Sequence, residues 1–327
     1  MPGRVLITRV IPEVGMKILQ NNNFNCRVHD QGRPISRSEF EEAIKETDAV
    51  LSMLNDRIDA DLLDLAPKLK IVANLAAGTD NIDLEACTER GIAVTNTPGA
   101  LTEATADLAM ALLLAGARHL VRADQYLREG KFNGWDPLLF TGAALNGKTL
   151  GIIGMGRIGQ AVAKRARSFG LKIVYHNRNA LPKEISSPLE AEYLSLDELV
   201  GSSDFISLHL PYSREVHHLI DDRRLRMMKP AAYLINTARG AHVDEKSLVE
   251  HLRAGNITGA ALDVFEHEPQ TAPGLTDLGN VTLLPHIGSA TMEARSEMAR
   301  MAAESIAAVL NGEMPNNILN PQVLNRN

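Results

Sequence analysis

The chain has 327 residues, of which 45% are hydrophobic, 4% aromatic and 23% charged, and its formal net charge is −6. This length exceeds what one compact core usually holds, so two domains are expected. Charges of both signs are interspersed without a long basic run, which disfavours nucleic acid as a partner. The longest apolar helix candidate, residues 108–117, is too short to cross a bilayer, so no membrane association is expected.

The N-terminal sequence and the cysteine content bear on the location of the protein. The N-terminus begins directly with a strand pattern and lacks the apolar core and cleavage site of a signal peptide. Cys26 and Cys87 are the only cysteines, and they suit neither a disulfide framework nor a zinc site. The expected location is therefore cytoplasmic, and no metal site is predicted.

The first hundred residues alternate short β-branched or aliphatic runs with helical patterns. Strands are predicted near residues 5–7, 49–53, 71–75 and 93–95, and helices near 12–21, 38–45, 60–66 and 84–90. This alternation is typical of a parallel sheet that is covered by helices on both faces.

A Pro-Gly turn at residues 97–100 interrupts the alternation, and a long helix then starts near Thr102. Further strands are predicted at 148–153, 172–175, 205–208, 232–236, 260–264 and 281–284, and a final helix at 292–310. The chain therefore contains two sets of parallel-sheet units, with one seam near residue 98 and another near 286.

A glycine-rich motif directly follows the strand at 148–153. It reads Gly154-Met155-Gly156-Arg157-Ile158-Gly159 and continues as a helical pattern. The first glycine permits a tight turn, the second lets the backbone approach a pyrophosphate, and the third lets helix and strand pack closely. Amide groups at the helix N-terminus then hold the phosphates. In this strand-to-helix context the motif predicts a dinucleotide site.

The next strand ends in Asn177-Arg178-Asn179, where an NAD enzyme usually carries an acidic residue for the ribose hydroxyls. A guanidinium at this place can pair with a 2′-phosphate, which an aspartate would repel. NADPH is therefore the expected cofactor, with NADH as the other nicotinamide cofactor to test. The alternative is that Arg178 stacks on adenine without discriminating between the two.

Three later strands each lead into one polar side chain: Arg239, Glu268 and His286. Carboxyl ends of parallel strands share one edge of a sheet, and chemistry in open α/β sheets is found at that edge. A nicotinamide enzyme must supply a proton donor and a positive clamp for its substrate. Arg239 would clamp a carboxylate and polarise a 2-oxo group, His286 would protonate the developing alkoxide, and Glu268 would orient His286 and favour its protonated form.

Most other histidines lie in polar or surface-like contexts and are not assigned a role. They are His29, His119, His176, His217, His218, His242 and His251.

The chain resembles the D-isomer-specific 2-hydroxyacid dehydrogenase family over essentially its whole length. The segments that carry the resemblance are 154–159, 236–240, 263–269 and 285–290. It implies an α/β fold of two Rossmann-like or flavodoxin-like domains with parallel sheets. The NAD(P)-binding domain, 99–286, would be inserted into a discontinuous substrate domain, 1–98 plus 287–327. It also implies that Arg239, Glu268 and His286 are the catalytic trio.

The same resemblance implies further site residues. In the substrate domain, backbone amides at Ala77 and Gly78 would bind the substrate carboxylate, and Leu54 would form a pocket wall. Further contacts to the cofactor are implied at Thr105, Leu210, Pro211, Thr237, Ala238, Asp263 and Gly288. Residues 211–215 depart from the usual Leu-Thr-Pro-Glu pattern, which affects only the detail of contacts to the cofactor ribose and phosphate.

Within the family, the chain looks most similar to glyoxylate/hydroxypyruvate reductases. In those enzymes a loop like residues 134–137 reaches a partner subunit, where its tryptophan closes the substrate pocket. Trp135 is the only tryptophan of this chain, so a homodimer is implied, and an anchor in the dimer core is the alternative role for Trp135. The expected reactions are glyoxylate to glycolate and hydroxypyruvate to D-glycerate.

Other activities remain to be distinguished. One is the same chemistry on a larger 2-oxo acid such as 2-ketogluconate. Phosphoglycerate dehydrogenase is less favoured because the sequence ends after a single terminal helix. A non-catalytic, NAD(P)-sensing corepressor is a different class, and the presence of Arg239, Glu268 and His286 argues against it.

Overall fold

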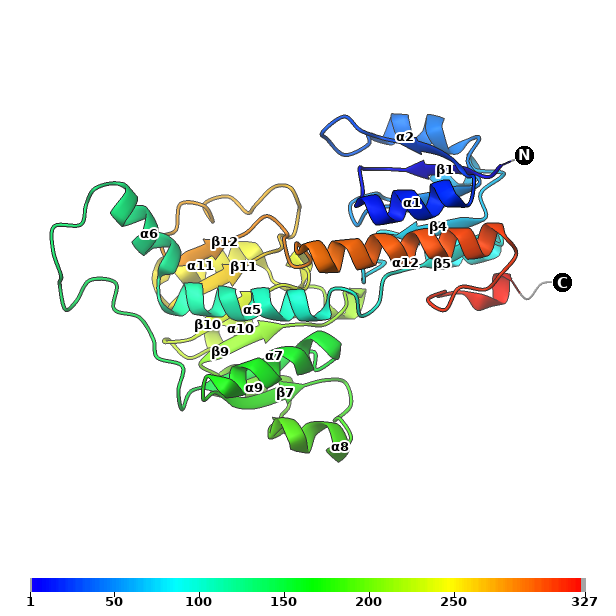
Figure 1. The fold of residues 1–327 in the computed structure, drawn as a ribbon. Helices are drawn as coiled ribbons and strands as arrows, with labels where there is room; N and C mark the ends of the chain where they lie inside the picture. Colours follow the sequence, from blue (N-terminus) through cyan, green and yellow to red (C-terminus); the bar gives the residue numbers. More distant parts are fainter. Residues whose placement is uncertain (1, 325–327) are drawn as a thin grey trace. The chain divides into compact units, whose positions relative to one another are not determined.

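The computed structural model describes residues 2–324, and the chain divides into two compact units (Figure 1). Unit 1 comprises Met1–Leu101 and Ser289–Asn327, and unit 2 comprises Thr102–Gly288. Unit 1 is therefore discontinuous in sequence, and unit 2 is inserted into it.

Unit 1 is built on a five-stranded, fully parallel sheet in the order β2-β1-β3-β4-β5. Its strands are β1 (Arg4–Ile7), β2 (Asn25–Val28), β3 (Ala49–Ser52), β4 (Ile71–Asn74) and β5 (Ala93–Thr95). This order is the flavodoxin-like one, in which ligands bind outside the carboxyl ends of the strands.

Helices cover both faces of this sheet. They are α1 (Glu13–Asn21), α2 (Arg37–Ile44), α3 (Ala60–Asp64), α4 (Leu84–Glu89) and α12 (Met292–Leu310), with a short 3₁₀ turn at Pro321–Val323. Successive β1 side chains point to opposite faces, so Val5 and Ile7 pack with Ile306 of α12, whereas Leu6 packs with Phe40 of α2. The C-terminal helix α12 lies along α1 and against β3, β4 and β5, and thereby completes the unit (Figure 1).

Unit 2 carries a seven-stranded parallel sheet in the order β12-β11-β10-β9-β6-β7-β8. Its strands are β6 (Thr149–Ile153), β7 (Lys172–His176), β8 (Ala191–Tyr193), β9 (Phe205–Leu208), β10 (Tyr233–Asn236), β11 (Gly259–Leu262) and β12 (Val281–Leu283). The order reverses at β6, which pairs with β7 on one side and β9 on the other. Dinucleotides bind at such a reversal in doubly wound sheets.

The helices of unit 2 also lie on both faces of its sheet. They are α5 (Thr102–Ala117), α6 (Leu120–Arg128), α7 (Arg157–Ser168), α8 (Lys183–Ser186), α9 (Leu196–Ser202), α10 (Asp222–Met227) and α11 (Glu245–Ala254), with 3₁₀ turns at Ser187–Leu189, Arg214–Val216 and Gly240–His242. Helix α5 packs on α7, β10 and β11 through fully buried residues such as Ala106 and Leu113. Burying one leucine contributes roughly 1.5–3 kcal/mol, so this helix is a main element of the core.

The fold class predicted from the sequence is confirmed, but the sequence analysis gives no range for strands β2 and β8 or for helices α6 and α8–α11. Both strands lie at the edges of their sheets, and neither contains a fully buried residue. Helix α6 likewise contains none. An apolar pattern arises from burial, so these exposed elements leave no clear signal in the sequence.

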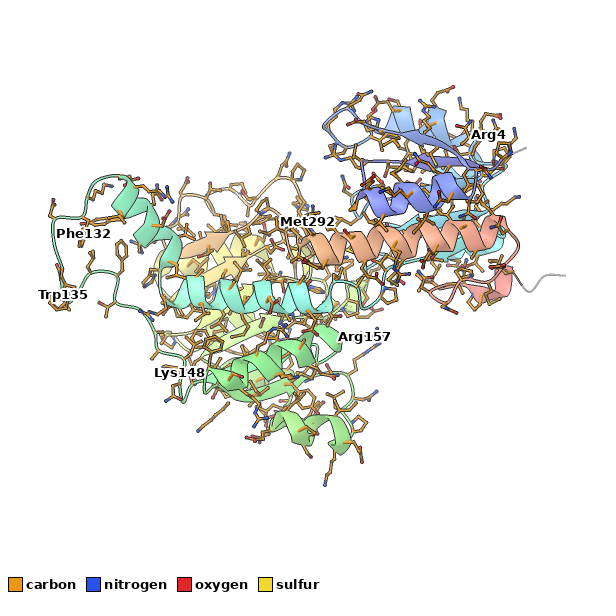
Figure 2. All side chains as sticks on the ribbon, in the orientation of Figure 1. Arg4, Phe132, Trp135, Lys148, Arg157 and Met292 are labelled. Atoms are coloured by element: carbon orange, nitrogen blue, oxygen red, sulfur yellow. The ribbon has the colours of Figure 1, made fainter. Side chains whose placement is uncertain are left out.

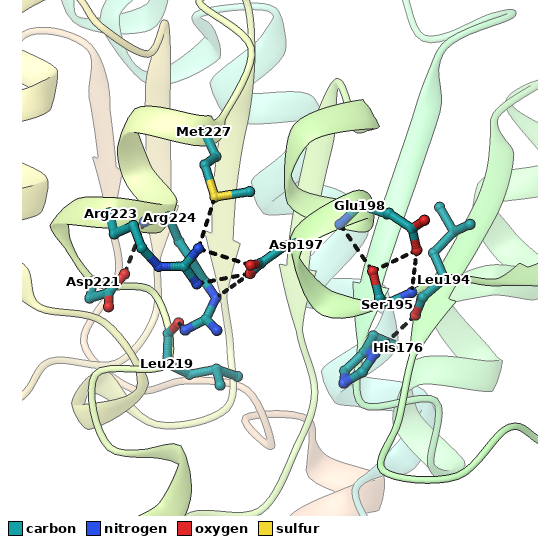
Figure 3. Close-up of polar contacts among 10 residues, drawn as sticks. All are labelled: His176, Leu194, Ser195, Asp197, Glu198, Leu219, Asp221, Arg223, Arg224 and Met227. Carbon is teal, nitrogen blue, oxygen red and sulfur yellow. Dashed lines mark hydrogen bonds and ion pairs between the residues drawn. The ribbon is translucent and has the colours of Figure 1, made fainter.

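Polar contacts fix the loops around α9 and α10 (Figure 3). Asp197 of α9 accepts hydrogen bonds from Arg223 at 2.8 Å and from Arg224 at 3.0 Å. The Arg223 guanidinium contributes most to lowering the pKa of Asp197, to about 2. Ser195 and Glu198 form a capping box at the start of the same helix. These contacts tie α9 to α10 on the outer side of unit 2.

Two further features bear on the sequence predictions. Both cysteines are free thiols, with Cys87 buried and Cys26 partly buried. Within residues 2–324 no single helix is long and apolar enough to cross a membrane. Helices α5 and α6 together have sufficient length and apolar composition, but they are bent by 64° relative to each other.

Candidate active site

The glycine-rich turn lies between β6 and α7, at the reversal point of the unit 2 sheet. Gly154 has a φ of +95°, a conformation that favours glycine. A Cβ on Gly159 would lie 2.3 Å from the carbonyl oxygen of Gly154, so only glycine allows α7 to pack this closely. Gly154 thus lies in a tight turn, and Gly159 lies at a close contact between α7 and that turn.

The N-terminus of α7 has the features of a phosphate cradle. Gly156 is the N-cap and makes no side-chain capping bond. A Cβ on Gly156 would meet no heavy atom within 4 Å, so the space above the backbone is open. The first amide groups and the positive end of the helix dipole face this space. The turn thus fits the pyrophosphate of a dinucleotide.

A second cofactor contact is suggested by the buried carboxyl group of Asp263, which follows β11. Its Oδ1 accepts the Ile287 amide at 2.7 Å, whereas its Oδ2 is buried without a hydrogen-bond partner among residues 2–324. Burial raises the pKa of Asp263. Thr105 of α5 donates to the carbonyl oxygen of Gly288 at 3.1 Å, beside this carboxyl group. A buried orphan oxygen of this kind fits an amide donor such as a carboxamide N–H.

At the end of β7, the two predicted selectivity residues have different surroundings. Asn177 accepts the Met155 amide at 2.7 Å, so its side chain braces the glycine-rich turn. Arg178 is exposed, and its charge is among those that lower the pKa of Glu215, after hydrogen bonds from Ser213 and the backbone. Arg178 therefore remains available to a ligand at the strand end, with Glu215 as a nearby opposite charge.

Two of the three predicted catalytic side chains are in direct contact. Nδ1 of His286 and Oε2 of Glu268 are 2.8 Å apart, and the other oxygen of Glu268 accepts the Phe265 amide at 3.0 Å. Burial acts to raise the pKa of Glu268, but the hydrogen bond and positive charge of His286 outweigh it, so the pKa lies below its usual range. With Nδ1 fixed by the carboxylate, Nε2 of His286 is the nitrogen left to face a substrate.

Arg239 lies in the turn after β10, close to the same loop. Its Nη1 donates to the Ala238 carbonyl oxygen at 2.8 Å, and its positive charge also lowers the pKa of Glu268. A Cβ on the following residue, Gly240, would lie 1.9 Å from the carbonyl carbon of Phe265. The absence of a side chain at Gly240 therefore allows the Arg239 turn and the Glu268 loop to meet.

Glu245, the first residue of α11, holds the Glu268 loop from behind. Its carboxylate accepts the Glu266 amide at 2.8 Å and the Ala272 amide at 3.3 Å. It is buried, and burial raises its pKa. Sequence reasoning does not find this residue, because its partners lie more than twenty positions away and no local motif marks them.

A buried histidine under the glycine-rich turn is also absent from the sequence analysis. Nε2 of His209 lies 2.7 Å from the Ser207 hydroxyl, and burial lowers the pKa of His209 to about 3. The imidazole is therefore neutral and lies 3.5 Å from the Thr237 hydroxyl, while the backbone of His209 packs against Gly154. His242 and His251 are buried as well, and both make polar contacts: Nδ1 of His242 lies 3.1 Å from the Arg239 carbonyl oxygen, and Nε2 of His251 lies 3.0 Å from Oδ1 of Asp222.

In unit 1, the residues predicted to bind substrate follow β4. The Ala76 carbonyl accepts the Thr97 amide at 2.9 Å, and the Ala77 carbonyl accepts from Asn96 at 2.6 Å. The Ala76 carbonyl shares a peptide with the Ala77 N–H, and the Ala77 carbonyl shares one with the Gly78 N–H. Because a trans peptide directs its N–H opposite to its C=O, the two N–H groups point away from Thr97 and Asn96. Two adjacent N–H groups oriented in this way suit an anionic group such as a carboxylate.

Leu54 and Trp135 are both exposed within their own units. Leu54 follows β3 in unit 1 and has 38% of its surface exposed, whereas Trp135 in unit 2 has 84%. Trp135 and Phe132 lie on the loop after α6 that stands off the rest of unit 2 (Figures 1 and 2). Phe140 anchors the returning end of this loop against Tyr126, with ring centroids 5.3 Å apart.

Comparison with known proteins identifies relatives across the whole chain. Residues 110–288 match the family described as D-isomer specific 2-hydroxyacid dehydrogenase, NAD binding domain. A glyoxylate reductase of Thermococcus litoralis is 50% identical, over 99% of this chain and 98% of its own. A solved protein of Thermus thermophilus is 46% identical, with a TM-score of 0.91 over 97% of this chain and 99% of that one.

A further solved relative is an NADPH-dependent glyoxylate/hydroxypyruvate reductase from Sinorhizobium meliloti, in complex with NADP and malonate. It is 31% identical, with a TM-score of 0.86 over 98% of this chain and of that one. A doubly wound sheet with a glycine-rich turn at its reversal point is the architecture of a dinucleotide-binding domain. The chain belongs to the D-isomer specific 2-hydroxyacid dehydrogenase family and is an NAD(P)-dependent dehydrogenase.

Proposed function

We propose that the protein is an NADPH-preferring reductase of small 2-oxo acids, converting glyoxylate to glycolate and hydroxypyruvate to D-glycerate. The observation that carries this proposal is the 2.8 Å contact between His286 and Glu268, beside Arg239, on the sheet that also holds the dinucleotide turn. The names of the relatives support the substrate class, since they include glyoxylate reductases.

Each residue of the trio has one task. The nicotinamide, when bound, supplies the hydride for the 2-oxo carbon. Arg239 holds the substrate carboxylate and polarises the carbonyl group through its guanidinium. His286 donates the proton from Nε2 to the oxygen that gains negative charge. Glu268 keeps His286 in the orientation and protonation state that this donation needs.

The units have complementary roles in this proposal. Unit 2 binds the cofactor, through the turn at residues 154–159 and the buried carboxyl group of Asp263. Unit 1 supplies the amides of Ala77 and Gly78 for the substrate carboxylate and the side chain of Leu54 for the pocket wall. The loop that carries Trp135 closes the substrate pocket of a second copy in a homodimer, which accounts for its 84% exposure in the single chain.

The preference for NADPH rests on Arg178. Because Asn177 is held by the Met155 amide, the exposed Arg178 is the cation at the strand end that can pair with a 2′-phosphate. The nearby Glu215 reduces this preference without abolishing it, since both side chains are exposed and screened by solvent.

The experiment that tests the proposal is a matrix of steady-state rates. Oxidation of NADPH and NADH is followed with glyoxylate, hydroxypyruvate, pyruvate and 2-ketogluconate. We expect the highest kcat/KM with NADPH and the first two acids. Turnover confined to 2-ketogluconate would refute the substrate assignment. Tight cofactor binding without any turnover would instead indicate a non-catalytic sensor.

An Arg178→Ala variant tests the cofactor preference separately. The ratio of kcat/KM for NADPH to that for NADH should fall about 10–100-fold, because one charge-assisted hydrogen-bond pair is lost. Arg226→Ala is the matched control, since Arg226 is also exposed and lies beside an acidic side chain, Asp222, outside the segment 211–215. An unchanged ratio in Arg178→Ala would show that Arg178 only stacks on adenine.

A further inference from the structure

Two adjacent histidines and a glutamate meet on unit 2, apart from the proposed catalytic trio. His217 and His218 follow the 3₁₀ turn Arg214–Val216, and Glu266 lies in the loop after β11. Nε2 of His218 is 2.6 Å from Oε1 of Glu266, and the two imidazole rings are stacked with centroids 4.0 Å apart. One ligand atom from each of the three residues lies within 4.8 Å of the others.

The backbone around this cluster is well fixed. The His218 amide donates to the Ala241 carbonyl at 2.8 Å, and Ile220 forms a parallel bridge with Val243. On the other side, the Glu266 amide is bound by the buried carboxylate of Glu245. Two segments that are distant in sequence are thereby held in register. Because the lone pair of an imidazole nitrogen lies in the ring plane, one of the two stacked rings must rotate about its side-chain bonds for both to bind the same ion.

The chemistry of the donors selects the ligand. Two imidazole nitrogens and one carboxylate suit zinc and its neighbours in the transition series, whereas Mg²⁺ and Ca²⁺ prefer sets made wholly of oxygen ligands. Three protein ligands leave a fourth position of a tetrahedral ion open to water. We propose that His217, His218 and Glu266 bind one divalent transition-metal ion of the zinc type.

Tyr212 supplies an outer contact that such a site needs. Its hydroxyl lies 3.3 Å from Nδ1 of His217. When Nδ1 carries the proton and donates to this hydroxyl, the lone pair of Nε2 is left for the metal. Ligating histidines commonly donate their second ring N–H to such an acceptor, which fixes the tautomer.

Occupation of the site would bear on the neighbouring catalytic loop. Glu266 precedes Glu268 by two residues, and the Glu266 amide is one of the two that Glu245 holds. An ion bound to Glu266 ties this loop to the His217 segment. The site binds metal whether or not the trio has the proposed catalytic role, because none of its ligands belongs to the trio.

The test uses the full-length protein after treatment with a chelator and desalting. Zn²⁺ is titrated in competition with a chromogenic chelator, and Co²⁺ is titrated separately for the visible absorption of a tetrahedral complex. We expect one Zn²⁺ per chain, with affinity about 100-fold lower in His217→Ala and about tenfold lower in Tyr212→Phe. Since His217 is exposed, its replacement should leave the fold intact, and circular dichroism together with a second variant, His217→Gln, checks this.

His267→Ala is the matched control, because His267 is exposed and adjacent to Glu266 but is not part of the cluster. Full affinity in this variant, together with its loss in both His217 variants, supports the site. Equal affinity in wild type and the His217 variants would overturn the proposal, as would binding of Zn²⁺ with no defined stoichiometry. The His218–Glu266 contact would then be an ion pair that merely joins two loops.

Discussion

The carboxyl ends of the two parallel sheets offer different chemistry on the same architectural plan. In unit 1 the residues proposed to bind substrate are peptide amides, at Ala77 and Gly78, whose orientation is set by neutral partners such as Asn96. In unit 2 the corresponding edge carries charged or titratable side chains, among them His286 and Glu268. Neutral peptide amides can bind and orient an anion, whereas titratable side chains can also transfer a proton.

In both units, side chains that do not contact the substrate in the proposed function hold the proposed site residues in place. Asn96 holds the peptide of unit 1, and the buried Glu245 holds the Glu268 loop of unit 2. If the comparison is right, changes in unit 2 should lower kcat, while changes in unit 1 should raise the KM for the 2-oxo acid.

The largest effect is expected for His286→Asn. Asparagine cannot donate the proton, so kcat should fall about 10²–10⁴-fold while NADPH binding, followed by its fluorescence, stays unchanged. The φ of His286 is +54°, a conformation that asparagine tolerates well, so the fold should be preserved. His119→Asn is the matched control, since His119 has a φ of +53°. Similar kcat values in the two variants would refute the role of His286.

A smaller loss of kcat is expected for Glu245→Gln, because Glu245 is a positioning residue. The amide replaces one of the two oxygens that accept the Glu266 and Ala272 amides, so the Glu268 loop is held less firmly. We expect kcat to fall about tenfold, the effect of one buried hydrogen bond, with the KM for NADPH unchanged. The matched control is Glu250→Gln, an exposed position on the same helix. A rise in KM without a change in kcat would contradict the positioning role.

In unit 1, Asn96→Ala should give the opposite kinetic pattern. Without the Asn96 side chain, the peptide between Ala77 and Gly78 is free to rotate, and the amide of Gly78 loses its orientation. We expect the KM for glyoxylate to rise about tenfold while kcat changes little. Asn25→Ala, at an exposed position on edge strand β2, serves as control. A fall in kcat at unchanged KM would remove the distinction between the edges.

The sequence locates the residues of the proposed catalytic trio better than the residues that hold them in place, and the reason is physical. Strand ends in a parallel sheet converge, so Arg239, Glu268 and His286 can each be located from a local pattern. Glu245 and Asn96 act through contacts between separate loops, and no periodicity or motif marks such partners. The same limit explains why the cluster of His217, His218 and Glu266 emerges only from the folded chain.

The smallest expected effect is on stability, and its sign follows from the pKa of Glu268. His286 lowers the pKa of Glu268 in the folded state. The Glu268–His286 pair therefore stabilises the folded protein above the pKa of Glu268 in the unfolded chain, about 4.3, and this stabilisation is lost as pH falls through the pKa of Glu268 in the folded protein. Lowering the pH from 7 to 4 should therefore destabilise the wild type more than Glu268→Gln, by less than about 1 kcal/mol, since the pair is partly exposed. Urea unfolding at a series of pH values measures this difference. Asn96→Ala removes no charge and should follow the wild-type pH dependence. A flattened pH dependence in that variant would mean that the Asn96 contact is itself coupled to a titrating group.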